Sequence, residues 1–286
     1  ALILIIWQVI GALGMSPTEA IQAVAADERS RMFVLDDWVS KQNFWKQFVS
    51  GAFIVVVMTG LDQDMMQKNL TCKTLREAQK DMCTYGFAFV PANLLFLALG
   101  VLLSMLAVQR GVPLPDMGDE LLPLFAASGS LGTLVVVLFT IGIVAASFSS
   151  ADSALTALTT SFCIDICGKP NDERLRKRAH LGMAAVFALF ILFFRAVNST
   201  SMLDAIYILC SYTYGPLLGL FAYALFTRRN VGGKWVLPVC LAAPLLCFVV
   251  ETLMQQFSTY RFGYELLMLN GALTFIGLWL TGNNEV

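Results

Sequence analysis

Residues 133–166 read TLVVVLFTIGIVAASFSSADSALTALTTSFCIDI, and this run is the most informative segment of the chain. Its first half is almost entirely apolar, and no charged residue within it precedes Asp152. A bilayer span requires about 20 predominantly apolar residues. Because the run exceeds this length and contains no proline, it predicts a transmembrane helix.

The composition of the whole chain indicates the same environment. The 286 residues are 57% hydrophobic and 14% charged, with a formal net charge of -1. Soluble domains average about 45–50% apolar and about 25% charged residues. These values predict a polytopic membrane protein in contact with a lipid bilayer. They argue against a disordered chain, a nucleic-acid-binding protein and a disulfide-stapled secreted module.

Apolar runs bounded by charges or by Gly and Pro clusters predict an all-α fold with about eight transmembrane helices. The predicted spans are 1–14, 44–62, 85–108, 131–166, 178–197, 203–227, 234–254 and 264–281. The loops after the second, fourth and sixth spans hold most of the Lys and Arg residues. By the positive-inside rule these loops and the C-terminal tail, 282–286, are expected in the cytoplasm.

The two long connections on the opposite side, 15–43 and 109–130, each contain a helical pattern. PTEAIQAVAADERSRMF occupies 17–33 and DELLPLFAA occupies 119–127. Short helices that cover an outward-facing cavity and plain solvated loops are both compatible with these patterns. The chain opens inside an apolar run without an initiator methionine, so we expect a longer protein whose N-terminal half precedes Ala1.

The sequence shows no constellation for enzymatic catalysis, so an enzyme is not expected. The seven cysteines include no CxxC pair and are interpreted as small apolar thiols. The single histidine, His180, follows the basic cluster at 174–178. An interfacial role is expected there rather than general-base chemistry.

Small and hydroxylated residues share one face of the run at 133–166. Ala146, Ser149 and Ser150 stand at i, i+3 and i+4, so a backbone carbonyl and two hydroxyls lie together. A dehydrated sodium ion takes about six oxygens, and hydroxyls with carbonyls can supply them. This face offers about half of that set, so a second helix must complete the site. Close helix packing is the alternative explanation of the same residues.

Asp152 and Ser153 follow one turn later on this predicted helix. A carboxylate within a span is costly, so it normally pairs with a cation or binds an ion. The two residues either form a second cation position or place a proton-titrating group beside the first. A salt bridge to a basic residue elsewhere in the protein is the third interpretation.

Two other spans carry features of a binding site. The span at 44–62 is short and contains Gly51 and Gly60, a pattern typical of a discontinuous transporter helix. Phe53 lies just past the early glycine, where it could stack on a substrate or simply pack. In the span at 85–108, Pro91 and Asn93 place a kink and an amide within one turn.

Three strings of this sequence resemble the sodium/solute symporter family, which includes sodium-coupled sugar, proline and sialic acid transporters of bacteria. They are TGLDQDMMQKNLTCKTLREAQKDM at 59–82, AASFSSADSALTALTTSFCIDI at 145–166 and SYTYGPLLGLFAYALFTRR at 211–229. The resemblance implies a multi-pass protein of the bacterial inner membrane. It also implies uptake of a small polar solute coupled to Na⁺.

The resemblance further implies the leucine-transporter-type inverted-repeat fold, here as one transmembrane domain, 1–286. Residues 1–14 would end the first repeat, 44–227 would form the second repeat, and 234–281 would be two peripheral helices. The first core helix of that fold would belong to the N-terminal half that precedes Ala1.

Site residues carry over from the family as expectations. The main sodium site would use the carbonyl of Ala146 and the hydroxyls of Ser149 and Ser150, together with carbonyls of the first core helix. A second sodium site would correspond to Asp152 and Ser153, although the family has hydroxyls there and the Asp departs from that pattern. Substrate contacts would include Phe53 and Asn93. A proton-coupled transporter that uses Asp152, and a non-transporting membrane sensor or scaffold, are the alternatives.

Overall fold

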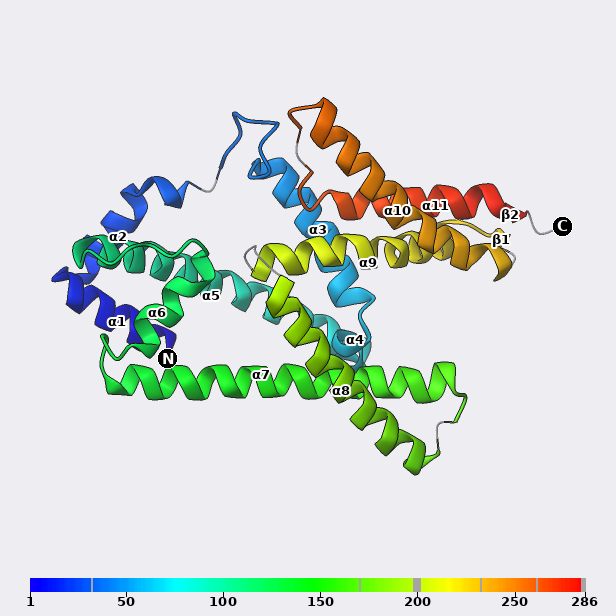
Figure 1. The fold of residues 1–286 in the computed structure, drawn as a ribbon, viewed down its shortest axis with the longest axis horizontal. Helices are drawn as coiled ribbons and strands as arrows, with labels where there is room; N and C mark the ends of the chain where they lie inside the picture. Colours follow the sequence, from blue (N-terminus) through cyan, green and yellow to red (C-terminus); the bar gives the residue numbers. More distant parts are fainter. Residues whose placement is uncertain (32, 170, 198–201, 232, 261, 284–286) are drawn as a thin grey trace. The chain divides into compact units, whose positions relative to one another are not determined.

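The structure, a computed structural model, describes residues 1–31, 33–169, 171–197, 202–231, 233–260 and 262–283 (Figure 1). The regular structure is helical apart from two short strands, β1 (Asn230–Val231) and β2 (Gly282–Asn283), which pair antiparallel. The prediction of a helical chain is therefore confirmed.

Each of the eight predicted spans contains a helix. These helices are α1 (Leu2–Leu13), α3 (Phe44–Gly60), α5 (Leu75–Gln109), α7 (Thr133–Ser161), α8 (Glu173–Val197), α9 (Met202–Phe226), α10 (Gly233–Phe257) and α11 (Leu266–Thr281). The remaining helices are short: α2 (Pro17–Ala26), η1 (Glu28–Ser30), α4 (Gln63–Leu70), η2 (Gly118–Glu120), α6 (Leu121–Ala127) and the π-helical turn η3 (Phe162–Ile166).

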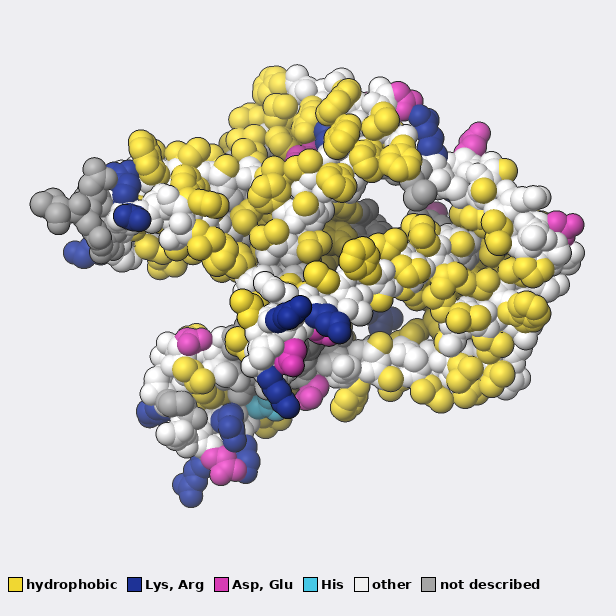
Figure 2. All heavy atoms as spheres, turned by 180° about the vertical axis from the view of Figure 1, so that it is seen from behind, with side chains coloured by type: hydrophobic (Ala, Val, Ile, Leu, Met, Phe, Trp, Pro, Cys, Tyr) yellow, Lys and Arg dark blue, Asp and Glu magenta, His cyan; other side chains and the backbone are white. Residues whose placement is uncertain are grey.

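Length and apolarity identify the membrane helices more strictly. Within the described ranges, five helices are long and apolar enough to cross a bilayer, namely α5, α7 with η3, α8, α9 and α10. The pair α1 and α2 meets the same criterion but is bent by 90°, and α3 and α11 are shorter apolar helices. Hydrophobic side chains cover much of the visible helix surface (Figure 2). The chain thus has the build of a polytopic membrane protein.

Two helices, α5 and α8, begin at least five residues before their predicted spans. The spans were bounded by apolarity, whereas a helix can continue into polar sequence. The helix α5 starts ahead of 85, where the side chain of Thr74 accepts a hydrogen bond from the backbone N–H of Glu77 at 3.2 Å. Likewise Asp172 accepts from the N–H of Leu175 at 3.0 Å at the start of α8. Such N-caps satisfy free N–H groups of a first turn.

The two long connections, 15–43 and 109–130, both contain short helices, which is one of the two alternatives that their patterns left open. Ser16 and Glu19 form a reciprocal capping box at the start of α2, with a bond of 2.7 Å from the N–H of Ser16 to the Glu19 carboxylate. Pro17 occupies the first helical position, where its missing N–H costs nothing. The second connection forms η2 and α6.

The chain divides into two compact units. The first comprises Ala1–Arg31 and Gln67–Ser201. Its apolar core lies where α1, α5 and α6 meet, and it includes Val9, Leu103 and Phe125. The helix α7 packs against α6 and α8.

The second unit comprises Met32–Met66 and Met202–Val286, and it is built on tight packing of α9 against α11. Gly219 permits this approach, because a Cβ there would lie 2.5 Å from the Cβ of Thr274 and 2.6 Å from the carbonyl of Gly271. Arg229, just past α9, donates hydrogen bonds to the carbonyls of Trp279 at 2.8 Å and Gly282 at 2.6 Å. These bonds join the C-terminal ends of α9 and α11.

A buried amide compensates for the backbone hydrogen bond that Pro216 removes from α9. Proline has no N–H, so the carbonyl of Tyr212, four residues earlier, lacks its helical partner. The fully buried Asn270 of α11 donates from Nδ2 to this carbonyl and to that of Ser211, each at 3.0 Å. The polar residues of this contact therefore serve helix packing.

Candidate functional site

The helix α7 carries the predicted sodium residues on one uninterrupted stretch of backbone. Because α7 runs from Thr133 to Ser161 without a break, Ala146, Ser149 and Ser150 lie on one face at i, i+3 and i+4. All three are exposed within their unit. A helical carbonyl retains a second lone pair after its backbone bond, so this face presents three oxygens to its surroundings.

The hydroxyls of Ser149 and Ser150 differ from two hydroxyls near the C-terminal end of the same helix. Farther along α7, Thr159 donates to the carbonyl of Leu155 at 2.7 Å, and Thr160 donates to that of Thr156 at 2.8 Å. Side-chain bonds of this kind use up the hydroxyl hydrogen within the helix. Among the described residues, neither serine has a hydrogen-bond partner for its side chain, so both oxygens are available to a ligand.

Asp152 and Ser153 extend this face by one turn. Asp152 is exposed and Ser153 is half-buried. Within the part of the chain that the structure describes, the Asp152 carboxylate makes no ion pair and no hydrogen bond. We call the set of five residues the α7 strip: Ala146, Ser149, Ser150, Asp152 and Ser153. Only 6% of the most apolar 18-residue segment of this helix is buried.

Asn93 lies on α5 in the first unit. Its side chain is half-buried, and its Nδ2 donates to the carbonyl of Phe89 at 3.0 Å. Its amide hydrogen is therefore partly engaged by its own helix. The assignment of Asn93 to a substrate site stays a prediction.

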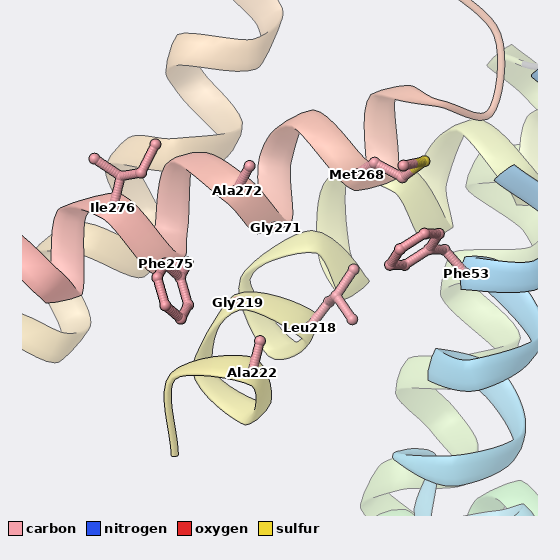
Figure 3. Close-up of a pocket in the computed structure, with 9 residues that line it drawn as sticks. All are labelled: Phe53, Leu218, Gly219, Ala222, Met268, Gly271, Ala272, Phe275 and Ile276. Atoms are coloured by element: carbon pink, nitrogen blue, oxygen red, sulfur yellow. The ribbon is translucent and has the colours of Figure 1, made fainter. Parts of the chain in front are cut away.

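Phe53 lies on α3 in the second unit, where it borders an apolar groove of about 450 Å³ (Figure 3). The other walls come from α9 and α11 and consist of Leu218, Gly219, Ala222, Met268, Gly271, Ala272, Phe275 and Ile276. The ring of Phe53 points from α3 toward Leu218 and Met268. These apolar walls would contact a hydrocarbon group more favourably than a polar solute. A substrate contact by Phe53 therefore also stays a prediction.

Two tyrosines of α9 make contacts that the sequence pattern did not predict. The hydroxyl of Tyr214 donates to the carboxylate of Asp62, just past α3, at 2.6 Å. The hydroxyl of Tyr212 donates to the carboxylate of Glu251 in α10, which also accepts from Gln255 at 3.2 Å. The signal in the sequence was the group of tyrosines before Gly-Pro, but their partners lie in distant segments of the chain.

A third polar cluster joins Lys46, in the first turn of α3, to the loop between α10 and α11. The Nζ of Lys46 sits 3.8 Å from the ring centre of Tyr260 and 3.8 Å from the carboxylate of Glu265. Tyr260 donates to Glu265 at 2.9 Å. Burial, the hydrogen bond to Glu265 and the charge of that carboxylate raise the pKa of Tyr260 to about 12.

Comparison of the chain with protein-family models, with curated proteins and with solved structures finds no match. The resemblance to sodium/solute symporters therefore rests on the three sequence strings and stays a prediction. Within the described ranges, no three His, Cys, Asp or Glu side chains gather into a metal-binding group. A site made of hydroxyls and carbonyls, such as the α7 strip, is of a different kind.

Proposed function

We propose that the chain belongs to a sodium-coupled secondary transporter that imports a small polar solute, such as a sugar, sialic acid or amino acid. The observation that carries this proposal is the α7 strip, on which the Ser149 and Ser150 hydroxyls share a face and engage no described partner. Sequence resemblance at 145–166 supports the same assignment. A packing role is less well supported, because the strip is exposed within its unit.

In this proposal Na⁺ binds the carbonyl of Ala146 and the hydroxyl oxygens of Ser149 and Ser150. These three oxygens are about half of a sodium coordination shell, so a second helix must supply the rest. The family resemblance assigns that role to the first core helix of the fold. An ion held between two helices stabilises only those states in which the helices are close, which couples ion binding to alternating access.

The finer architecture belongs to the same proposal. The eight helices at the predicted spans cross the inner membrane of a bacterium, and the C-terminus faces the cytoplasm. The helices α3, α5, α7, α8 and α9 form the second inverted repeat, with α10 and α11 at its periphery. Solute flux without chemical conversion is the expected activity.

Uptake by the full-length protein in proteoliposomes tests the assignment. Changing Ser149→Ala together with Ser150→Ala removes two ligands, each worth about 1.5–3 kcal/mol when bound to a charge. We expect the sodium concentration for half-maximal uptake to rise at least about 100-fold. Thr160→Val is the matched control, because its hydroxyl is bonded to its own helix. Unchanged sodium dependence in the double variant would refute the proposal.

Proton coupling through Asp152 is the second candidate, favoured by a carboxylate that has no described partner in an apolar helix. It predicts that uptake follows a pH gradient without sodium and that Asp152→Asn abolishes it. If vesicles show no flux of any solute tested, a sensor or scaffold role is favoured instead.

A further inference from the structure

A pocket of about 380 Å³ lies in the first unit between the end of α7 and the first turns of α8. It is lined by Thr156, Thr159, Thr160, Arg176, Lys177 and His180. Figure 2 shows Lys and Arg side chains gathered where α8 begins. Its size falls in the range of small-ligand pockets, and its lining is rich in hydrogen-bond donors.

The charge of the pocket comes from two cations that the fold leaves accessible. Arg176 makes no ion pair with any described residue. Lys177 pairs with Glu173 at 2.9 Å, but the two side chains are 76% and 67% exposed. Such a surface pair contributes little and exchanges readily with another anion. The pocket therefore presents two positive charges.

The hydroxyls and the histidine complete the donor set. The hydrogen of Thr159 goes to the carbonyl of Leu155 at 2.7 Å, so the Thr159 oxygen accepts from His180 Nδ1 at 3.2 Å. This bond fixes the orientation of the imidazole ring. Thr156 has no described partner for its hydroxyl, which is thus free to donate to a ligand. Guanidinium, ammonium and hydroxyl donors together suit a phosphate group.

Beyond this pocket the surface of α8 is apolar. On the face of α8 that continues from His180, Phe187 is half-buried and Ile191 is exposed, and none of the most apolar 18-residue segment of α8 is buried. A molecule whose phosphate occupies the pocket could lay hydrocarbon chains along this helix. A soluble anion would gain nothing from that surface.

We propose that the pocket between α7 and α8 binds the phosphate of an anionic phospholipid headgroup. Arg176 and Lys177 contact the phosphate, Thr156 donates to it, and the acyl chains follow α8. Basic pockets between transmembrane helices are known to bind anionic headgroups in this manner. The proposal does not depend on the transport assignment, because no residue of the α7 strip takes part.

Binding of fluorescent phosphatidylglycerol to the full-length protein in detergent tests it, with phosphatidylcholine as the zwitterionic reference. The variant with Arg176→Gln and Lys177→Gln should bind phosphatidylglycerol about 30-fold more weakly, which corresponds to about 2 kcal/mol. Binding of phosphatidylcholine should not change. Circular dichroism and gel filtration establish that the variant is folded.

The control variant carries Arg174→Gln and Arg178→Gln, which remove the same charge from residues outside the pocket lining. The affinity of this control variant for phosphatidylglycerol should fall by less than about threefold, because exposed charges at a distance are screened. Equal loss in both variants would overturn the proposal, as would equal binding of the two lipids by the unchanged protein. Displacement of the lipid by millimolar inorganic phosphate would instead identify a soluble-anion site and overturn the lipid assignment.

Discussion

The α7 strip and the contact between α9 and α11 contain the same kinds of residues, but the hydrogen bonding of these residues differs. Both place small and hydroxylated side chains in apolar helices. At the contact, Gly219 admits Thr274, and both amide hydrogen bonds of Asn270 go to carbonyls of α9. On the α7 strip, Ser149 and Ser150 engage no described partner. Polar residues in a membrane helix therefore indicate a ligand site only where their hydrogen bonds are not already made within the fold.

Two buried hydroxyls at this contact are bonded to carbonyls of their own helices. Ser211 donates to the carbonyl of Tyr207 at 2.8 Å, and Thr274 donates to that of Asn270 at 2.9 Å. Each hydroxyl is buried, so an unmade bond would cost free energy in the absence of water. The exposed serines of the α7 strip meet no such requirement within their unit.

The largest expected effect is that of Gly219→Ala on the free energy of unfolding. The new Cβ would lie 2.5 Å from Thr274 and 2.6 Å from the Gly271 carbonyl, so one helix must shift. Overpacking of this kind costs about 2–3 kcal/mol. Gly142→Ala on α7 is the matched control, because no atom lies within 4 Å of its added Cβ. Unfolding by SDS titration in micelles measures the free energy of unfolding of both variants. An equal loss of stability in Gly219→Ala and Gly142→Ala would contradict the proposed difference between the α9–α11 contact and α7.

Asn270→Leu is expected to have the next largest effect. It leaves the carbonyls of Ser211 and Tyr212 without their donor in a buried contact, at a cost of about 1–1.5 kcal/mol in a membrane protein. The same unfolding measurement on Ser149→Ala should show a change of less than about 0.5 kcal/mol. A destabilisation by Ser149→Ala as large as that by Asn270→Leu would mean that the α7 strip is a packing surface.

The fold was predictable where the determining pattern lies within one segment. Apolar runs located a helix in each predicted span, and spacing alone put Ala146, Ser149 and Ser150 on one face, since an unbroken helix fixes that geometry. The helix starts were missed because polar sequence with an N-cap, as at Thr74, continues a helix beyond its apolar part. Relations between helices were not predictable from periodicity. The role of Asn270 was not predictable from its own segment, because it depends on the N–H that Pro216 lacks in another helix.

The smallest expected effect concerns Tyr260, whose hydroxyl is bonded outside the long helices. Its pKa is raised from 10.0, the ordinary value of the free side chain, to about 12 in the folded chain. The folded state thus favours the protonated hydroxyl, so its stabilising contribution is fully present below pH 10. That contribution falls as the pH rises from 10 through 12, because the unfolded chain loses the proton first.

Comparison with Tyr260→Phe isolates this contribution. Below pH 10 the variant should be less stable by about 0.5–1 kcal/mol, the usual net value of one hydrogen bond. The difference should shrink between pH 10 and 12, where the unchanged protein alone carries the titrating hydroxyl. A difference that is constant over this range would show that the Tyr260 hydroxyl is solvated rather than bonded to Glu265. The cluster would then resemble the α7 strip, with a polar side chain whose bond is not made inside the fold.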